Sequence, residues 1–176
     1  MTSFPLSQSE IVHLFSITLP PDVTINIVPL KEYIGNALNH PFIQHQIRLG
    51  VYTKESIWGD FLSPSASFMR PRIVEVCYDL LGLLAVGVED GALIKGYIQN
   101  LALHEAHHFE INDDPITWQE HAENELECIQ ATAVANPAVT VKADKFEQAS
   151  LAFQRVSARI QAIMEADNDE RASALP

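Results

Sequence analysis

The sequence predicts an α+β domain, with most of its strands in the first half and its long helices in the second. Runs of β-branched residues stand before residue 80, whereas apolar residues spaced three or four apart dominate after Gly91. A strand-rich half followed by a helical half is typical of α+β proteins. With 176 residues the chain is most simply one domain. We expect this domain to cover residues 1–166, followed by a frayed polar tail at 167–176.

The first half combines short helices with short strands. Ser7 and Glu10 form a capping-box pattern, which predicts a helix from Ser7 to Ser16. The alternating β-branched run at 23–28 predicts a strand, and a helix is expected to follow at 30–38. The remaining expected elements are strands at 47–53, 57–62 and 72–78, a loop at 63–67, and a segment at 80–88 that fits either a helix or a strand.

The second half predicts three helices separated by strong breakers. The first covers residues 92–109 and contains one glycine and no proline. Asn112 to Pro115 ends it, a second helix runs from about Thr117 to Val134, and Asn136-Pro137 ends that one. The third is expected over 142–166, where apolar residues repeat at spacings of three or four, as a packing face requires.

Charge is distributed unevenly along the chain, whose formal net charge is −12. Between Lys95 and Lys142 there are eight acidic residues, four of the seven histidines and no Lys or Arg. Such a segment has a negative potential that favours a bound cation, although a solvated acidic helix face gives the same pattern. Clustered basic residues are absent from the sequence, which argues against nucleic acid as the main partner.

The sequence predicts a cytoplasmic protein that does not bind membranes. It has no basic, apolar leader at its start and no uninterrupted apolar run of the ~18 residues that a membrane span needs. The two cysteines, Cys77 and Cys128, form no disulfide framework and are expected to be reduced thiols. Nothing in the sequence indicates an oligomeric state.

One short motif indicates a chemistry: His104-Glu105-Ala106-His107-His108 reads H-E-x-x-H. Residues four apart lie on one face of a helix, so the imidazoles of His104 and His108 can reach the same metal ion. Glu105 lies about 100° around the helix axis, close enough to serve as a base without being a ligand. In a chain of this composition the motif is expected by chance roughly 0.02 times.

The sequence resembles a small gluzincin, the class of zinc peptidases in which H-E-x-x-H is followed by a glutamate ligand. The apolar lead-in Leu101 to Glu105 and the pattern Glu125-Leu126-Glu127-Cys128 carry the resemblance, which covers roughly residues 70 to 135. His107 and Glu110 depart from the small or apolar residues that are usual at these positions. No third histidine follows at metzincin spacing, which excludes that class.

The resemblance implies a short sheet, a metal-binding helix and then a helix that carries the third ligand to Zn²⁺. Glu127, separated from His108 by 18 residues, is the first candidate for this ligand, and Glu123 is its alternative. Zinc would activate a water molecule, and Glu105 would act as general base in the hydrolysis of a peptide bond.

Two further components are left open by the sequence. The candidates for the donor that stabilises the tetrahedral intermediate are Tyr97 and His121, with Tyr78 and His107 as further candidates. The substrate is expected to be a specific protein partner, which can add as an extended strand to the edge of the segment at 57–62 or at 72–78.

Two other functions remain possible from the sequence. The first is a catalytically inactive zincin-fold protein that binds or inhibits a partner. The second is a carboxylate-bridged di-iron site, because Glu10-Ile11-Val12-His13 repeats the E-x-x-H pattern of Glu105 to His108. A four-helix bundle would be needed for the second, and the strand-like segments before residue 80 argue against it.

Overall fold

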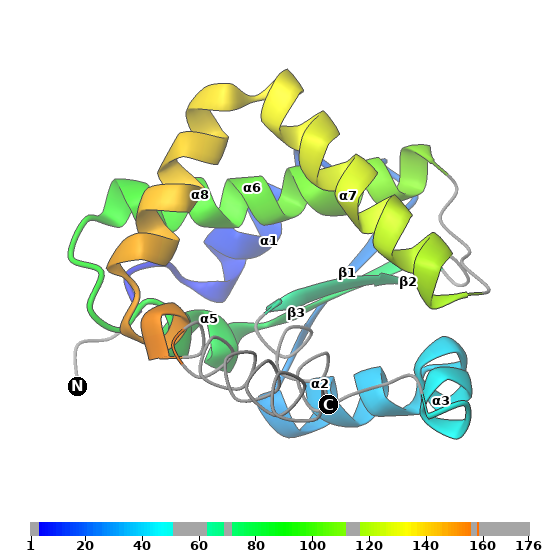
Figure 1. Cartoon of the computed structure of the whole chain (residues 1–176). Coiled ribbons are helices and arrows are strands. Elements are labelled where there is room, and N and C mark those ends of the chain that lie inside the picture. The colour runs from blue at the N-terminus through cyan, green and yellow to red at the C-terminus, as the bar shows by residue number, and fades with distance from the viewer. Residues whose placement is uncertain (1–3, 51–62, 69–71, 112–116, 156–157, 159–176) are drawn as a thin grey trace, which may run out of the picture.

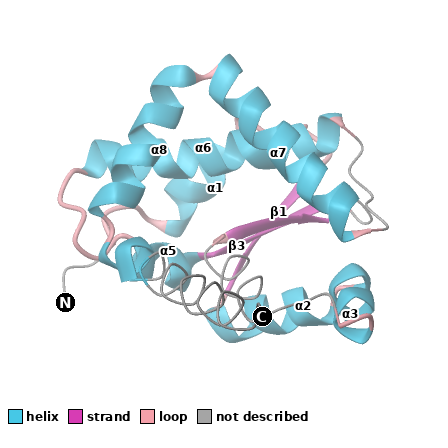
Figure 2. Ribbon diagram, viewed as in Figure 1, coloured by secondary structure: helices cyan, strands magenta, loops and turns pink. Residues whose placement is uncertain are grey.

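The structure is a computed structural model that describes residues 4–50, 63–68, 72–111, 117–155 and 158. A three-stranded sheet stands between two layers of helices (Figure 1). Its strands are β1 (Thr24–Val28), β2 (Ser65–Phe68) and β3 (Ile73–Cys77), in the spatial order β1-β3-β2. Strand β3 is parallel to β1 and antiparallel to β2. The mixture of a small sheet and many helices confirms the predicted α+β class (Figure 2).

Strand β2 corrects one expectation, because residues 63–67 were expected to form a loop. Ser65 pairs with Val76 and Phe68 with Ile73, so the end of this segment adds a strand to the sheet. Ser and Ala have little intrinsic preference for strands, and the pairing with β3 overrides that weak local signal. Of the three described strands, β2 is an edge strand and β3 is central.

The described residues of the first half form the helices α1 (Gln8–Ser16), α2 (Leu30–Asn39), α3 (Pro41–Arg48) and α5 (Tyr78–Leu84). The capping box predicted at the start of α1 is present. The backbone N–H of Glu10 donates to Ser7 Oγ, and the backbone N–H of Ser7 donates to Glu10 Oε2. Strand β3 confirms most of the strand expected at 72–78. In the ambiguous segment 80–88, α5 makes residues up to Leu84 helical, and a turn follows at 85–87.

The strand expected at 47–53 is wrong where the structure describes it. Ile47 and Arg48 end α3, which Pro41 begins as its first residue. Proline is favoured at this position because its fixed φ suits a helix and its missing N–H would be unpaired there in any case. Residues 51–53, the strand expected at 57–62 and the tail at 167–176 lie outside the described residues.

In the second half the structure describes the long helices α6 (Gly91–Glu110), α7 (Trp118–Ala135) and α8 (Pro137–Ala149). The predicted break after α7 is confirmed, and Pro137 also starts the next helix. None of the described helices is both long and apolar enough to cross a membrane.

The helix expected over 142–166 begins earlier than predicted and is interrupted at Ser150. The Ser150 hydroxyl donates to the carbonyl oxygen of Leu84 at 2.6 Å and accepts from the backbone N–H of Phe153 at 3.3 Å. The second bond is that of an N-cap, and residues 151–155 are helical again. The hydroxyl of Ser150 therefore links the end of α8 to Leu84, which is 66 positions away, and caps the helical segment that follows.

The two faces of the sheet pack against different helices. Val74 and Val76 on β3 are fully buried in the core that α1, α6 and α8 complete. Glu75 points to the other face, where it accepts a hydrogen bond from Asn36 of α2 at 2.9 Å. Figure 1 shows α2 and α3 on the opposite side of the sheet from α1 and α6. The sheet therefore supports α6, the helix that carries the H-E-x-x-H motif.

Helix α6 is held closely by α8 at Gly96. A Cβ atom added at Gly96 would lie 2.5 Å from Cβ of Lys142, well inside the contact distance of two carbon atoms. Since Cβ of Lys142 is fixed to its backbone, the two helices would have to separate to accept it.

We predict that Gly96→Ala and Gly35→Ala change stability in opposite directions. Gly96→Ala should lower the free energy of unfolding by about 1–3 kcal/mol, the usual range for overpacking. Gly35 is also inside a helix, but an added Cβ meets nothing within 4 Å. Gly35→Ala should therefore raise stability by up to about 1 kcal/mol, since alanine favours the helix. Urea denaturation measures both; equal effects would contradict the close approach of α6 and α8.

Candidate metal centre

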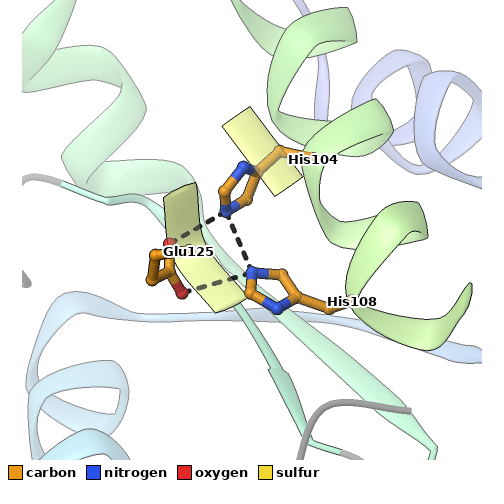
Figure 3. Close-up of side chains that lie close together, drawn as sticks. All are labelled: His104, His108 and Glu125. Atoms are coloured by element: carbon orange, nitrogen blue, oxygen red, sulfur yellow. Dashed lines mark hydrogen bonds and ion pairs between the residues drawn. The ribbon is translucent and has the colours of Figure 1, made fainter. Parts of the chain in front are cut away.

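Three side chains from two helices converge beside the sheet (Figure 3). The Nε2 atoms of His104 and His108, both on α6, are 3.0 Å apart. The Glu125 carboxylate of α7 lies against both rings: Oε2 is 3.1 Å from Nε2 of His104, and Oε1 is 3.2 Å from Nε2 of His108. Each side chain thus directs a metal-binding atom toward the other two.

Protons alone cannot satisfy these three contacts. Each Nε2 atom carries at most one proton, and the ionised carboxylate carries none, so two protons at most serve three contacts. When both nitrogens are protonated, the contact between them sets two N–H groups against each other. A cation between the three atoms removes the conflict, because each then offers it a lone pair.

The donor spacing suits a small tetrahedral cation. Bonds of 2.0–2.1 Å to a tetrahedral zinc ion place the ligand atoms about 3.3 Å apart. The two Nε2 atoms are 3.0 Å apart, and each has one Glu125 oxygen at 3.1 or 3.2 Å. Two imidazoles and a carboxylate are a donor set that zinc and several other transition metals accept, and the set leaves a fourth position open. The residues therefore fit a catalytic type of metal site without fixing the metal.

Local sequence positions each of the three donors. His104 and His108 face the same way because they are one helical turn apart on α6. A capping box between Thr117 and Glu120 fixes the start of α7 and thus the rotation of its residues about the axis. The buried residues of α7 are Cys128 and Thr132, and Glu125, three residues before Cys128, continues this inward face.

Electrostatics hold the Glu125 carboxyl ionised. Partial burial acts to raise its pKa, but the contacts with His104 and His108 outweigh burial and hold the pKa well below its usual range. The ring of His108 is buried, whereas His104 and Glu125 have side chains that are 18% and 36% exposed. The group is therefore anchored in the interior and open to solvent on one side.

The structure does not bring the expected third ligand, Glu127, to the histidines, nor its alternative Glu123. Both are exposed, and Glu123 accepts a hydrogen bond from the Gln119 side chain at 2.8 Å. Each lies two residues from Glu125, which is about 200° around the helix, so neither shares its inward face. The carboxylate that contacts the histidines belongs to Glu125. In the sequence this residue was noted only as the first of the pattern Glu125-Leu126-Glu127-Cys128.

Glu105, the expected general base, is buried between α6 and the sheet, with only 3% of its surface exposed. Its Oε1 atom accepts a hydrogen bond from Ser65 Oγ of β2 at 3.1 Å, and its Oε2 atom is buried without a hydrogen-bond partner. Buried carboxylate oxygens are normally paired, so a lone one marks either a strained group or a group waiting for a ligand. Sequence reasoning did not find Ser65, which is 40 residues away.

Two of the tyrosines considered as donors have other roles. Tyr97 is 4% exposed and stacks on Phe146 of α8, with ring centroids 4.2 Å apart, and burial raises the pKa of its hydroxyl. In the structure Tyr97 therefore packs as a core residue. Tyr78 donates its hydroxyl to the carbonyl oxygen of Leu6 at 2.8 Å.

The two histidines considered as donors lie nearer the metal-binding group in sequence. His121 is one helical turn before Glu125 on α7, and its ring contacts that of Phe42 from α3, with centroids 5.2 Å apart. His107 pairs through Nδ1 with Glu110 Oε2 at 2.8 Å, while its Nε2 atom is buried without a hydrogen-bond partner. His121 thus remains a candidate donor.

The residues of the second E-x-x-H pattern do not join the metal-binding group. Glu10 is exposed and occupied by the capping box of α1. His104, His108 and Glu125 form the candidate metal-binding group found among the described residues, and it contains neither Glu10 nor His13. The group found among the described residues thus does not combine the four carboxylates and two histidines of a di-iron site.

Comparison with known proteins adds no relative: the chain matches no protein family model, no curated protein and no solved structure.

We predict that metal binding depends on Glu125 and not on Glu127. Glu125→Ala should weaken zinc affinity by more than the roughly 10- to 100-fold that loss of a residue supporting a ligand costs. Glu127→Ala removes the same charge from the same helix and should leave the affinity nearly unchanged. Competition with a chromophoric chelator measures both variants. An equal loss in the two would mean that charge alone, rather than coordination, accounts for the effect.

Proposed function

We propose that this protein is a zinc-dependent metallopeptidase of the gluzincin type, cutting a peptide bond in a specific protein partner. The observation that carries the proposal is the convergence of both H-E-x-x-H histidines on a glutamate from the following helix. Their two Nε2 atoms are 3.0 Å apart, and each lies within 3.2 Å of a different oxygen of the Glu125 carboxylate. That arrangement is the one the gluzincin resemblance implies, with Glu125 in place of Glu127 as the third ligand.

Zinc, when bound, supplies a Lewis acid that activates water and polarises the scissile carbonyl group. Glu105 then accepts a proton through Oε2, the oxygen that has no hydrogen-bond partner, and passes it to the leaving amine. Ser65 holds the other oxygen, so the base keeps one orientation. His121 is the proposed donor to the oxyanion, since it stands one turn from Glu125 on the same side of α7.

The substrate is proposed to bind as an extended strand along β2. The sequence offered the segment 72–78 for this pairing. Strand β3, which lies in that segment, is central in the sheet and already pairs on both sides. Strand β2 is an edge among the described strands, and its Ser65 contacts the proposed base directly. Pairing at this edge would therefore bring a substrate backbone close to Glu105.

A second candidate function is a partner-binding protein that keeps the zincin arrangement without turnover. The outer face of α7 favours it, because Leu126 and Ile129 are 54% and 56% exposed and lie three residues apart on that face. Exposed apolar residues that adjoin on a helix are a common feature of protein interfaces.

We predict that Glu105→Gln stops hydrolysis and leaves metal binding intact. The amide cannot accept the proton, so kcat should fall by about 10²- to 10⁴-fold. Cleavage in peptide mixtures, followed by mass spectrometry, and zinc content are measured together. His104→Ala is the control that should lose both. If the biological effect of the protein survives Glu105→Gln unchanged, the binding function is favoured over the peptidase.

We also predict that Ser65→Ala lowers kcat with little change in zinc affinity. Loss of its hydrogen bond frees Glu105 to turn, while His104, His108 and Glu125 are not touched. The effect should be roughly 10- to 100-fold, since a bond to a charged group contributes about 1.5–3 kcal/mol. Ser65→Thr, which keeps a hydroxyl, is the matched control. In the Glu105→Gln background, Ser65→Ala should have no further effect on kcat.

A further inference from the structure

Helix α7 turns its large apolar side chains toward solvent. Leu126 and Ile129 are 54% and 56% exposed, and Ala122 is exposed as well. The side of the helix that meets α6 holds the small residues Cys128 and Thr132, both buried. A helix that only completed a core would show the reverse arrangement, with its large apolar residues inside. The outer side of α7 therefore presents apolar surface to solvent.

These apolar residues form one continuous stripe. Ala122, Leu126, Ile129 and Ala133 follow one another at spacings of four, three and four residues. Residues at these spacings share one face of a helix, and two helices of a coiled coil pack along a seam of this kind. This outer stripe is about 16 Å long at 1.5 Å per residue. It is therefore long enough to contact about three turns of another helix.

One flank of the outer stripe is acidic. Glu123 and Glu127 are exposed, lie one helical turn apart, and directly follow Ala122 and Leu126. The Gln119 side chain donates to Glu123 Oε1 at 2.8 Å and so holds that carboxylate beside the stripe. Helix α7 contains no Lys or Arg. Whatever covers the stripe must therefore tolerate negative charge along this flank.

The charge of α7 decides between the possible occupants. A second copy packed through its own α7 would bring further carboxylates and no basic residue to pair with Glu123 and Glu127. An extended strand needs free backbone groups to pair with, and the face of a helix offers none. An amphipathic helix with Lys or Arg beside its own apolar residues complements both the stripe and its acidic flank.

We propose that the outer stripe of α7 docks an amphipathic helix of a protein partner, with apolar residues at spacings of three and four and with Lys or Arg along one flank. The apolar contact supplies most of the affinity, and the charges select the partner and its orientation. Ile129 is one helical turn after Glu125, so the stripe passes beside the metal-binding group. The inference goes beyond the proposed hydrolysis and does not depend on it.

The test uses three fluorescent peptides of about 18 residues, each made helical by the same side-chain staple. The first has Leu at the spacing of the stripe and Lys on one flank. The second carries Glu in place of Lys, and the third carries Ser in place of Leu. Binding to the zinc-loaded full-length Glu105→Gln protein, in which cleavage is blocked, is measured by fluorescence anisotropy.

The first peptide should bind at least roughly tenfold more tightly than either of the others, because each of those lacks one of the two complementary features. If the first and third peptides bind equally, charge alone explains binding and the docking stripe is wrong. If the first and second bind equally, the partner is not selected by basic residues and the proposed partner class is wrong.

Matched apolar variants locate the binding surface. Leu126→Ser combined with Ile129→Ser should weaken binding of the first peptide at least roughly tenfold, because two large apolar contacts are lost. Leu83→Ser combined with Val86→Ser is the control, since these residues are 55% and 52% exposed but lie outside α7. Far-UV circular dichroism and zinc content verify that each variant is folded. Equal weakening by both pairs would contradict the proposed surface.

Matched charge variants test the acidic flank. Glu123→Gln combined with Glu127→Gln should remove most of the preference for the first peptide over the second. Glu89→Gln combined with Asp144→Asn neutralises two exposed carboxylates outside α7 and should leave that preference in place. If both pairs reduce the preference equally, it comes from the total charge of the protein and not from the flank of the stripe.

Two further outcomes separate the inference from another occupant and from the proposed function. If the protein alone sediments as a dimer that Leu126→Ser with Ile129→Ser dissociates, the stripe binds a second copy and the partner helix is wrong. Selective binding of the first peptide by a protein that cuts no peptide would support the docking surface and contradict the peptidase. Cleavage of peptide mixtures with equal binding of all three helical peptides would do the opposite.

Discussion

The contact of α7 with α6 is the constraint on which the rest of the site depends, because it sets one carboxylate against two imidazoles. The three contacts among these groups, at 3.0–3.2 Å, exceed what the available protons can satisfy. Each helix is held independently: α6 by the close approach of α8 at Gly96, and α7 by the capping box at Thr117. A cation that binds this preformed group would join two elements that are already in place, so binding adds directly to stability.

Local signals predicted those parts of the fold that local interactions determine. The capping box of α1, the β-branched run of β1 and the break at Pro137 all depend on residues within a few positions of one another. Strand β2 and the interruption at Ser150 were missed because distant partners create them. Ser65 becomes part of a strand by pairing with Val76, and Ser150 leaves its helix to bond Leu84. No property of serine indicates either outcome in advance.

In the candidate site, too, local interactions were predictable from the sequence and contacts between distant residues were not. The positions of His104 and His108 follow from one helical turn, so the motif predicted them correctly as neighbours. The third donor depends on which face of α7 meets α6. Apolar residues usually mark the buried face of a helix, but on α7 Leu126 and Ile129 point outward. The inward face is marked by Cys128 and Thr132, small residues that let the helices approach, and Glu125 lies on that face. A buried cysteine three residues after a glutamate was the available signal, and it favoured Glu125 over its neighbour Glu127.

Burial and charge divide the acidic residues of this region into two groups with different consequences. Glu105 and Glu125 are fixed by hydrogen bonds, so each presents defined oxygen atoms. Glu123 and Glu127 are exposed, and neither belongs to the metal-binding group. Ser65 connects the sheet to the first group, because its backbone pairs at the edge of the sheet and its side chain bonds the proposed base. A segment added along β2 would restrict the backbone of Ser65 and, through one hydrogen bond, the orientation of Glu105. In a peptidase built this way, substrate pairing and the alignment of the base are a single event, and a segment that fails to pair leaves the base less well ordered.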